Sequence, residues 1–146
     1  MRDVVEEQRL CFAATVCEDG SPNLSPKGTV WVWSESELAF FDLASPQTIR
    51  NLERDPRIEL NVVDQRLRRG FRFKGRATVT HASRDLLEAL GRFPRKAPEA
   101  SRIRSLVVVE VEQARPLVSP VYAVTDDPEA VGREWEAYWL KLWGRD

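Results

Sequence analysis

Apolar and polar residues alternate along much of this chain in short runs, and these runs predict a protein built mainly of antiparallel β-strands. Turn-forming residues separate the runs, and Asp19-Gly20 between the first two is typical of a hairpin turn. The strand segments that we predict are 11–16, an interrupted run that resumes at 29–33, 38–43, 57–63, 70–80 and 103–111. Six short strands with few helices describe a closed or nearly closed β-barrel, and an OB-like barrel fits the same pattern.

Helical patterns occupy segments between and after the predicted strands. We expect a short amphipathic helix over 2–10, a second helix that begins after Ser45, a third over 84–93 capped by Ser83, and a last one over 128–143. Ser45 suits the N-cap of the second helix. Pro46 suits its first helical position, because the N–H that proline lacks would have no intrahelical partner there.

In the last helix, tryptophan recurs every four residues, at Trp135, Trp139 and Trp143. This spacing produces a broad apolar stripe, which predicts packing of the helix on the barrel or across a dimer interface. Contact between one tryptophan edge and the ring of a bound cofactor is the alternative interpretation.

Length and charge narrow the class of protein. A chain of 146 residues suits a single domain over 1–146 with one core, and a net charge of -1 predicts no overall attraction to nucleic acid or membranes. The first ten residues lack the apolar centre of a signal peptide. Cys11 and Cys17 would lie roughly 20 Å apart on a straight strand, so we expect free thiols and a cytoplasmic location.

The chain contains a single histidine, His81. A zinc site needs several converging ligands, and a Ser-His-Asp triad needs a firmly held histidine. We therefore predict neither a metal site nor a set of catalytic side chains. Any redox chemistry would have to come from a bound cofactor.

The start of the second helix is a candidate anion site. The backbone N–H groups of Gln47 and Thr48, together with the hydroxyls of Ser45 and Thr48, would face a bound anion at the positive end of the helix dipole. An ordinary capped helix is the alternative, because many helices begin in this way.

A second candidate is the sequence Ser25-Pro26-Lys27-Gly28-Thr29, which interrupts the second strand. Such an interruption indicates a bulge or a close approach of the backbone to a bound group. Lys27 would place a cation there, and a cation near the N1 edge of a reduced flavin stabilises its negative charge. The alternative is a bulge at a barrel corner, with Lys27 in solvent.

A third candidate is segment 66–76, which contains six basic residues and no acidic one. On a strand, Arg72, Lys74 and Arg76 share one face, while Phe71 and Phe73 share the other. This arrangement fits a phosphate-bearing ligand or a single-stranded nucleic acid. It also fits a half-buried strand whose basic face is solvated and balanced by acidic neighbours, which we favour.

Taken together, these segments resemble the pyridoxamine 5'-phosphate oxidase-like superfamily of FMN-binding split barrels. The resemblance runs over most of the chain, and its specificity lies in the order and spacing of the pieces. The segments that carry it are 12–16, 18–22, 25–29, 38–43, SPQTIRNL at 45–52, 55–57 and GFRFKGRA at 70–77.

The resemblance implies a mainly β fold with flanking helices, a six-stranded antiparallel split β-barrel. It also implies a homodimer with flavin mononucleotide (FMN) in a cleft between the subunits. The implied cofactor-binding residues are Ser25, Pro26, Lys27, Gly28 and Thr29 along the ring and ribityl chain, Phe41 and Asp42 on the third strand, Ser45, Gln47 and Thr48 at the phosphate, and Gly70 and Phe71 near the subunit interface.

The chain departs from the family pattern in two places. Gln47 stands where many members carry a basic residue, so phosphate binding would depend on backbone N–H groups, Thr48 and a nearby arginine such as Arg50. The basic, His-containing C-terminal signature of true pyridoxamine phosphate oxidases is missing from 142–146, so oxidation of vitamin B6 is not expected. Members that use a deazaflavin share the barrel, and deazaflavin stays an alternative cofactor.

We therefore predict an FMN-dependent oxidoreductase that transfers a hydride or electrons at the flavin ring. Its partners would be a small-molecule substrate or electron donor and a second copy of the chain, with no nucleic acid or membrane. A non-enzymatic flavin-binding or electron-carrier protein is one alternative. An OB-like barrel that binds nucleic acid through its basic strand is another, and its binding would weaken steeply with salt.

Overall fold

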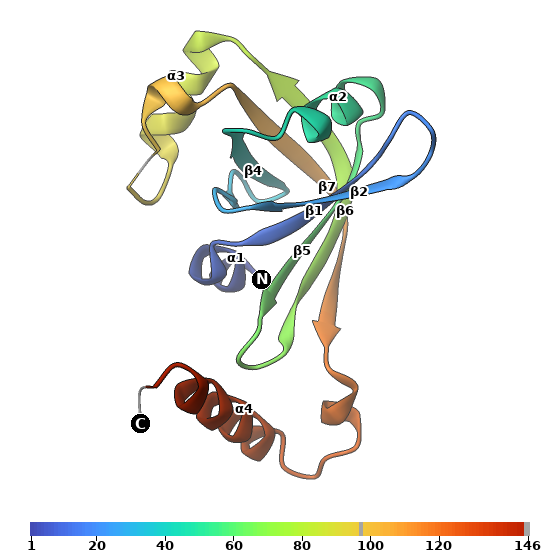
Figure 1. Ribbon diagram of the computed structural model, residues 1–146, viewed down its shortest axis with the longest axis vertical. Coiled ribbons are helices and arrows are strands. Elements are labelled where there is room, and N and C mark those ends of the chain that lie inside the picture. The colour runs from blue at the N-terminus through green and yellow to red at the C-terminus, as the bar shows by residue number, and fades with distance from the viewer. Residues whose placement is uncertain (97, 145–146) are drawn as a thin grey trace.

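The computed structural model describes residues 1–96 and 98–144 and confirms a mainly β protein with helices around a curled antiparallel sheet (Figure 1). Ala97 and the last two residues of the C-terminal segment considered above lie outside the described residues. The strands are β1 (Cys11–Val16), β2 (Pro22–Lys27), β3 (Trp31–Val32), β4 (Glu37–Asp42), β5 (Arg57–Asp64), β6 (Arg69–Thr80) and β7 (Ser105–Val118). Over the described residues these seven strands form one sheet in the order β2-β1-β5-β6-β7-β4-β3.

The sheet has one strand more than we predicted, because the interrupted second strand is divided into β2 and β3. The two pieces lie at opposite edges of the sheet, although only residues 28–30 separate them in the chain. The sheet therefore curls until its two edges approach each other without pairing. Pro26 is tolerated near the end of β2 because an edge strand has one side free of ladder hydrogen bonds.

The helices are α1 (Arg2–Gln8), α2 (Pro46–Arg54), α3 (Ser83–Arg92) and α4 (Pro128–Leu142), with short 3₁₀ turns at Ala100–Arg102 and Pro120–Ala123. α1 ends two residues earlier than predicted, because Arg9 adopts a left-handed conformation with φ 55°. Ser83 does not cap α3, because it is the first helical residue and Ala82 occupies the N-cap.

β7 extends well beyond the predicted segment 103–111 and pairs with β6 as far as Val118. Pro116 therefore lies inside the strand, opposite Phe71 in the ladder. Beyond Glu110, β7 has no second neighbour in the sheet order, because its pairing with β4 ends there. A proline is compatible with that stretch, since its missing N–H can face the free side.

Two apolar clusters lie on opposite faces of β4. Phe40 is fully buried in the barrel interior, whereas the adjacent Phe41 is buried against α3 and the segment that follows it. Successive side chains of a strand point to opposite faces, so a strand covered on both sides needs apolar residues at every position. This explains the continuous apolar run Leu38-Ala39-Phe40-Phe41.

α4 lies beyond the end of the barrel, next to the turn that joins β5 to β6 (Figure 1). The guanidinium of Arg68 in that turn stacks 3.2 Å above the Trp135 ring, and Trp139 Nε1 donates a hydrogen bond of 3.2 Å to the Gln65 carbonyl. Tyr138 and Trp143 remain about half exposed. Packing of the tryptophan stripe on a second subunit stays a prediction.

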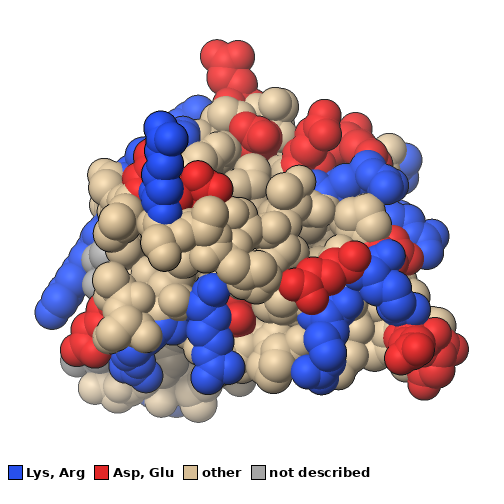
Figure 2. Space-filling view, turned by 90° about the horizontal axis from the view of Figure 1, so that it is seen from above, with Lys and Arg blue, Asp and Glu red and all other residues tan. Residues whose placement is uncertain are grey.

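Figure 2 shows the molecule from above, along its long axis, and on this face basic and acidic side chains are interspersed. This mixture agrees with the net charge of -1. Among the described residues, the helices are too short or too polar to span a bilayer.

Candidate functional site

A buried lysine ammonium lies at the start of α2. Lys27, at the end of β2, is only 4% exposed. Its Nζ donates hydrogen bonds to Ser25 Oγ at 2.5 Å, Ser45 Oγ at 3.0 Å and Thr48 Oγ1 at 3.4 Å. The three acceptors are neutral hydroxyls, one from β2 and two from the first turn of α2 or its N-cap.

Local sequence fixes the position of this helix start. Asp42, the last residue of β4, accepts a hydrogen bond of 2.7 Å from the Ser45 backbone N–H through Oδ1. Ser45 occupies the N-cap, as predicted, but its hydroxyl makes no capping hydrogen bond and accepts one from Lys27 instead. The serine hydroxyl therefore holds a cation at the helix start instead of closing the first turn.

A network behind α2 holds the helix against β1. Asn51, 2% exposed, donates from Nδ2 to Thr15 Oγ1 at 3.0 Å, and Thr15 Oγ1 also accepts from Asn23 Nδ2 at 3.1 Å. The sequence analysis missed this role of Asn51. The available signal was a polar residue next to Leu52 on the apolar side of a short helix, where an amide needs buried partners.

Burial sets the electrostatics of the site. Removal from water lowers the pKa of Lys27, while the neighbouring Asp42 carboxylate opposes this effect. Burial also raises the pKa of the Cys11 thiol to about 12, against the opposing effect of the Lys27 charge. Cys11 is therefore a protonated thiol, and the charge beside it belongs to the ammonium. An ammonium, hydroxyl groups and free first-turn N–H groups together favour an anion, above all a phosphate.

Thr29 spans the break between β2 and β3. Its Oγ1 accepts a hydrogen bond from the Phe41 N–H and donates one to the Phe41 carbonyl, both at 3.0 Å. A side chain thus takes the place of a ladder partner for β4. Segment 25–29 therefore stays beside β4 and the start of α2.

Several predicted residues are placed differently. Gln47 is exposed and its side chain is engaged along the helix, donating to Asn51 Oδ1 at 2.8 Å and accepting from Arg50 Nη2 at 2.6 Å. Gly70 and Phe71 lie at the start of β6, at the end of the barrel opposite α2 (Figure 1). Within one chain these two residues do not join the site. Pro26 and Gly28 remain beside it through the backbone of segment 25–29.

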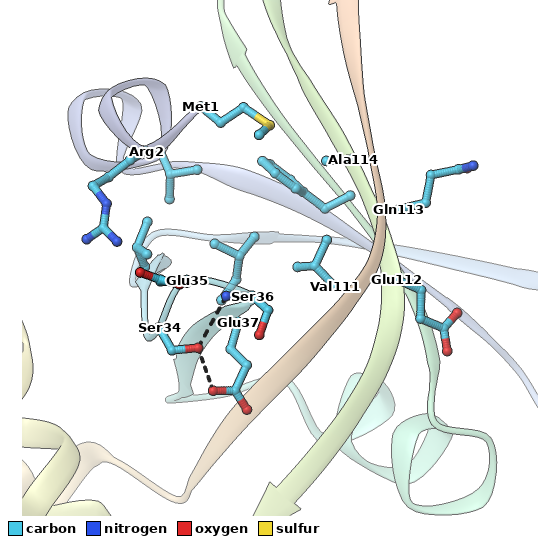
Figure 3. A pocket seen from close by; sticks show the side chains of 14 residues that line it. Met1, Arg2, Ser34, Glu35, Ser36, Glu37, Val111, Glu112, Gln113 and Ala114 are labelled. Carbon is cyan, nitrogen blue, oxygen red and sulfur yellow. Dashed lines mark hydrogen bonds between the residues drawn. The ribbon is translucent and has the colours of Figure 1, made fainter.

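A cavity of about 380 Å³ opens at another part of the barrel, between α1, the β3–β4 turn and β7 (Figure 3). Apolar side chains such as Phe73 and Val111 line its floor, and Glu35 and Glu37 lie on its rim. Ser34 Oγ donates to Glu37 Oε2 at 2.7 Å. None of the sequence-predicted site residues lines this cavity.

The basic strand is balanced by a neighbouring carboxylate. On β5, Glu59 pairs with Arg72 Nε at 2.9 Å and with Lys74 Nζ at 3.5 Å. These ion pairs favour the interpretation of a solvated basic face over a nucleic-acid surface. Among the described residues, the His, Cys, Asp and Glu side chains form no cluster suited to a metal ion.

A curled antiparallel sheet that forms a half-barrel with flanking helices is the architecture of a split barrel. The sequence profile described as "Pyridoxamine 5'-phosphate oxidase" matches residues 1–118. The chain therefore belongs to the pyridoxamine 5'-phosphate oxidase family, and the resemblance noted from its sequence is confirmed. A comparison with curated proteins returned no match.

Solved structures with the same fold include HupZ from Group A Streptococcus. It is 26% identical, with a TM-score of 0.71 over 82% of this chain and 92% of that chain. An F420 reductase is similar at 21% identity, with a TM-score of 0.61 over 78% of this chain and 94% of that chain. General stress protein 26 from Bacillus anthracis is similar at 15% identity, with a TM-score of 0.60 over 79% and 88%. The last two share the fold alone.

Proposed function

We propose that this protein binds FMN and works as a flavin-dependent oxidoreductase. The observation that carries the proposal is the buried Lys27 ammonium, whose only hydrogen-bond partners in the described chain are hydroxyl groups at a helix start. Holding a charge out of water is costly unless an opposite charge compensates it. The Asp42 carboxylate is near Lys27 but forms no ion pair with it among the described residues. The phosphate of FMN would supply that direct contact, and the free N–H groups of the first turn would supply further donors.

Each neighbouring residue has a defined part in binding. Lys27 neutralises the phosphate, Asp42 fixes the Ser45 backbone, and Thr29 keeps the interrupted strand beside Phe41. When bound, the flavin supplies hydride or electron transfer at its ring. The chain supplies orientation and charge.

The fit extends to a deazaflavin, because such cofactors also carry phosphate groups, and one structural neighbour is described as an F420 reductase. FMN is preferred here because the Lys27 pocket offers one ammonium and one helix start, which match a single terminal phosphate. An electron carrier without an organic substrate would use the same pocket. The two differ only in whether an organic substrate docks over the flavin ring.

The proposal includes a homodimer with the flavin near the interface. Phe12 on β1 and Leu24 on β2 are 44% and 65% exposed on the outer face of the sheet. Exposed apolar side chains gathered on one face are typical of an interaction surface. A second copy on this face would also explain how Gly70 and Phe71, remote within one chain, could approach the cofactor.

The Lys27→Met variant tests the phosphate pocket. We expect FMN affinity, measured by fluorescence titration, to fall roughly 10- to 100-fold, the loss that follows removal of one charge-assisted hydrogen bond. Affinity for riboflavin, which has the ring but no phosphate, should change little. Thr48→Glu should abolish FMN binding, because it places a carboxylate against the phosphate.

Lys74→Met is the matched control, since Lys74 is an exposed lysine on the outer face of β6. It should bind FMN as the unmodified protein does. Equal losses for FMN and riboflavin in Lys27→Met would show that the ammonium does not face the phosphate. If the unmodified protein stays colourless with saturating FMN and deazaflavin, the proposed function is wrong.

A further inference from the structure

A second, partly buried cation lies beside the same interruption, on the side of β3. Arg95, in the segment after α3, donates from Nη2 to the Val30 carbonyl at 2.8 Å, and its guanidinium lies 4.9 Å from the centre of the Phe93 ring. Its other terminal nitrogen, Nη1, is buried and has no hydrogen-bond partner in the described part of the chain.

A buried guanidinium nitrogen without a partner is unusual. Buried polar groups are nearly always paired, and a charged donor left unpaired costs more than a neutral one. Exposed arginine side chains normally avoid this cost by turning to water. Arg95 is instead held against Val30 and Phe93, so its free donor is available to a group that comes from outside the chain.

The charges around Arg95 do not satisfy it. Burial lowers the pKa of Arg95, the neighbouring Arg9 lowers it further, and Glu6 opposes both. Glu6 already accepts a hydrogen bond of 3.1 Å from the Val32 N–H. Two arginines and one glutamate leave a local charge of +1, which one carboxylate would neutralise and a dianionic phosphate would exceed.

The place of this pair follows from the strand register. Cys11 pairs with Lys27 in the antiparallel β1–β2 ladder, so Arg9, two residues before Cys11, lies toward the chain just after Lys27. Val30 directly follows Thr29. The Phe93 ring beneath Arg95 packs 5.5 Å from Phe41 and 5.0 Å from Trp31, measured between ring centres. The cation therefore adjoins segment 25–29 and is backed by an aromatic wall.

We propose that Arg95 and Arg9 bind the carboxylate of an organic monocarboxylic acid, with the apolar part of that acid against the partly exposed Phe93 ring. Where the proposed flavin function holds, this acid is the substrate class. Arg95 is then a specificity-determining residue, because it meets the charged end of the substrate and takes no part in the redox step.

The test is calorimetric titration with 2-naphthoate, 2-naphthamide and 2-naphthyl phosphate, which share one ring system and differ in charge. The unmodified protein should bind the naphthoate at least 10-fold more tightly than the neutral amide. Arg95→Gln should remove that preference, and Arg9→Gln should reduce it. Arg92→Gln is the matched control, because Arg92, the last residue of α3, likewise stacks on an aromatic ring and donates to a backbone carbonyl.

Equal binding of the acid and the amide would overturn the proposal. An equal loss of naphthoate affinity in the Arg92→Gln and Arg95→Gln variants would overturn it as well. If 2-naphthyl phosphate binds more tightly than 2-naphthoate and its binding depends on Arg95, the choice of a carboxylate is wrong. Each titration is run without flavin and with FMN added, and loading is read from visible absorbance. If FMN does not load but naphthoate still binds in a way that depends on Arg95, the proposed function alone is refuted. If FMN loads but naphthoate does not bind in this way, the present inference alone is refuted.

Discussion

At the scale of single residues, the site depends on polar groups that are paired across breaks in secondary structure. Lys27 and Thr29 are only two positions apart in the chain, but their side chains have different partners. Lys27 donates to hydroxyl groups, whereas Thr29 bonds to the backbone of Phe41. Lysine is almost never fully buried without a partner. The pattern of the strand predicted a cation near a bound group, but strand periodicity cannot predict toward which neighbour a long flexible side chain turns.

The two Thr29 hydrogen bonds give a direct prediction. Thr29→Val keeps the shape of the side chain but leaves the N–H and carbonyl of Phe41 without their partner. We expect a loss of about 1–3 kcal/mol in the free energy of unfolding, measured with urea. Thr29→Ser retains the hydroxyl and should lose much less. An unchanged midpoint in Thr29→Val would show that water replaces both contacts.

His81 gives a pH-dependent prediction. Its pKa is raised, first by the hydrogen bond to Glu53 at 3.0 Å on α2 and then by the Arg104 carbonyl. The protonated form is therefore favoured in the folded state, so His81 adds stability below its ordinary pKa of 6.5, and this stability is lost as pH rises through the raised pKa.

The measurement for His81 is the melting temperature of the unmodified protein and of His81→Gln. Because both side chains are half exposed or more, we expect a difference of only about 1–3 °C near pH 5.5 that disappears near pH 8.5. Glu53→Gln should flatten the same profile. A difference that grows with pH would contradict the assignment of the hydrogen bond.

At the scale of elements, the sequence predicted the existence and type of nearly every strand and helix, while tertiary context decided where they end. The Ser45-Pro46 start of α2 follows from local preferences, and the structure agrees. The division of the second strand and the continuation of β7 past Pro116 depend on which strands are edges. Edge position is a property of the sheet order, which no local pattern contains.

The irregularity between β6 and β7 supplies a prediction at this scale. A Cβ atom on Gly75 would lie 1.9 Å from the Glu110 carbonyl oxygen, at the register shift after Lys74. Because backbone must move to accommodate it, we expect Gly75→Ala to lose about 2–4 kcal/mol of unfolding free energy.

Gly91 in α3 is the internal control for this change. A Cβ there meets nothing within 4 Å, so Gly91→Ala should be neutral or should gain about 0.5–1 kcal/mol from helix propensity. Chemical denaturation of both variants decides the matter. Similar stabilities would mean that the ladder between β6 and β7 relaxes freely around residue 75.

At the scale of the whole molecule, the sheet curls without closing and leaves apolar side chains on its outer face. The sequence predicted a barrel, and for contact with a second copy it indicated the tryptophan stripe of the last helix and the surroundings of Gly70 and Phe71, but not the β1–β2 face. Strand periodicity gives alternate faces, and curvature decides which of them is inside. The same limit applies to the Arg9–Arg95 pair, whose members are far apart in sequence and are brought near each other by the fold.

Leu24→Asp tests the face formed by β1 and β2. A carboxylate in the centre of an apolar contact leaves an uncompensated charge there, so we expect the dimer to dissociate in sedimentation velocity. Leu87→Asp is matched to it, because Leu87 on α3 is also 65% exposed. If both variants sediment alike, the dimer uses another face.

Cys11 is fully buried in β1, and its thiol has a pKa of about 12. Because the thiolate is the nucleophile, alkylating reagents cannot modify Cys11 until β1 separates from β2 and β5. Cys17, just past the end of that strand, is partly exposed and reports the reagent's intrinsic rate. The ratio of the two labelling rates therefore measures how often the barrel wall opens, with no engineered probe.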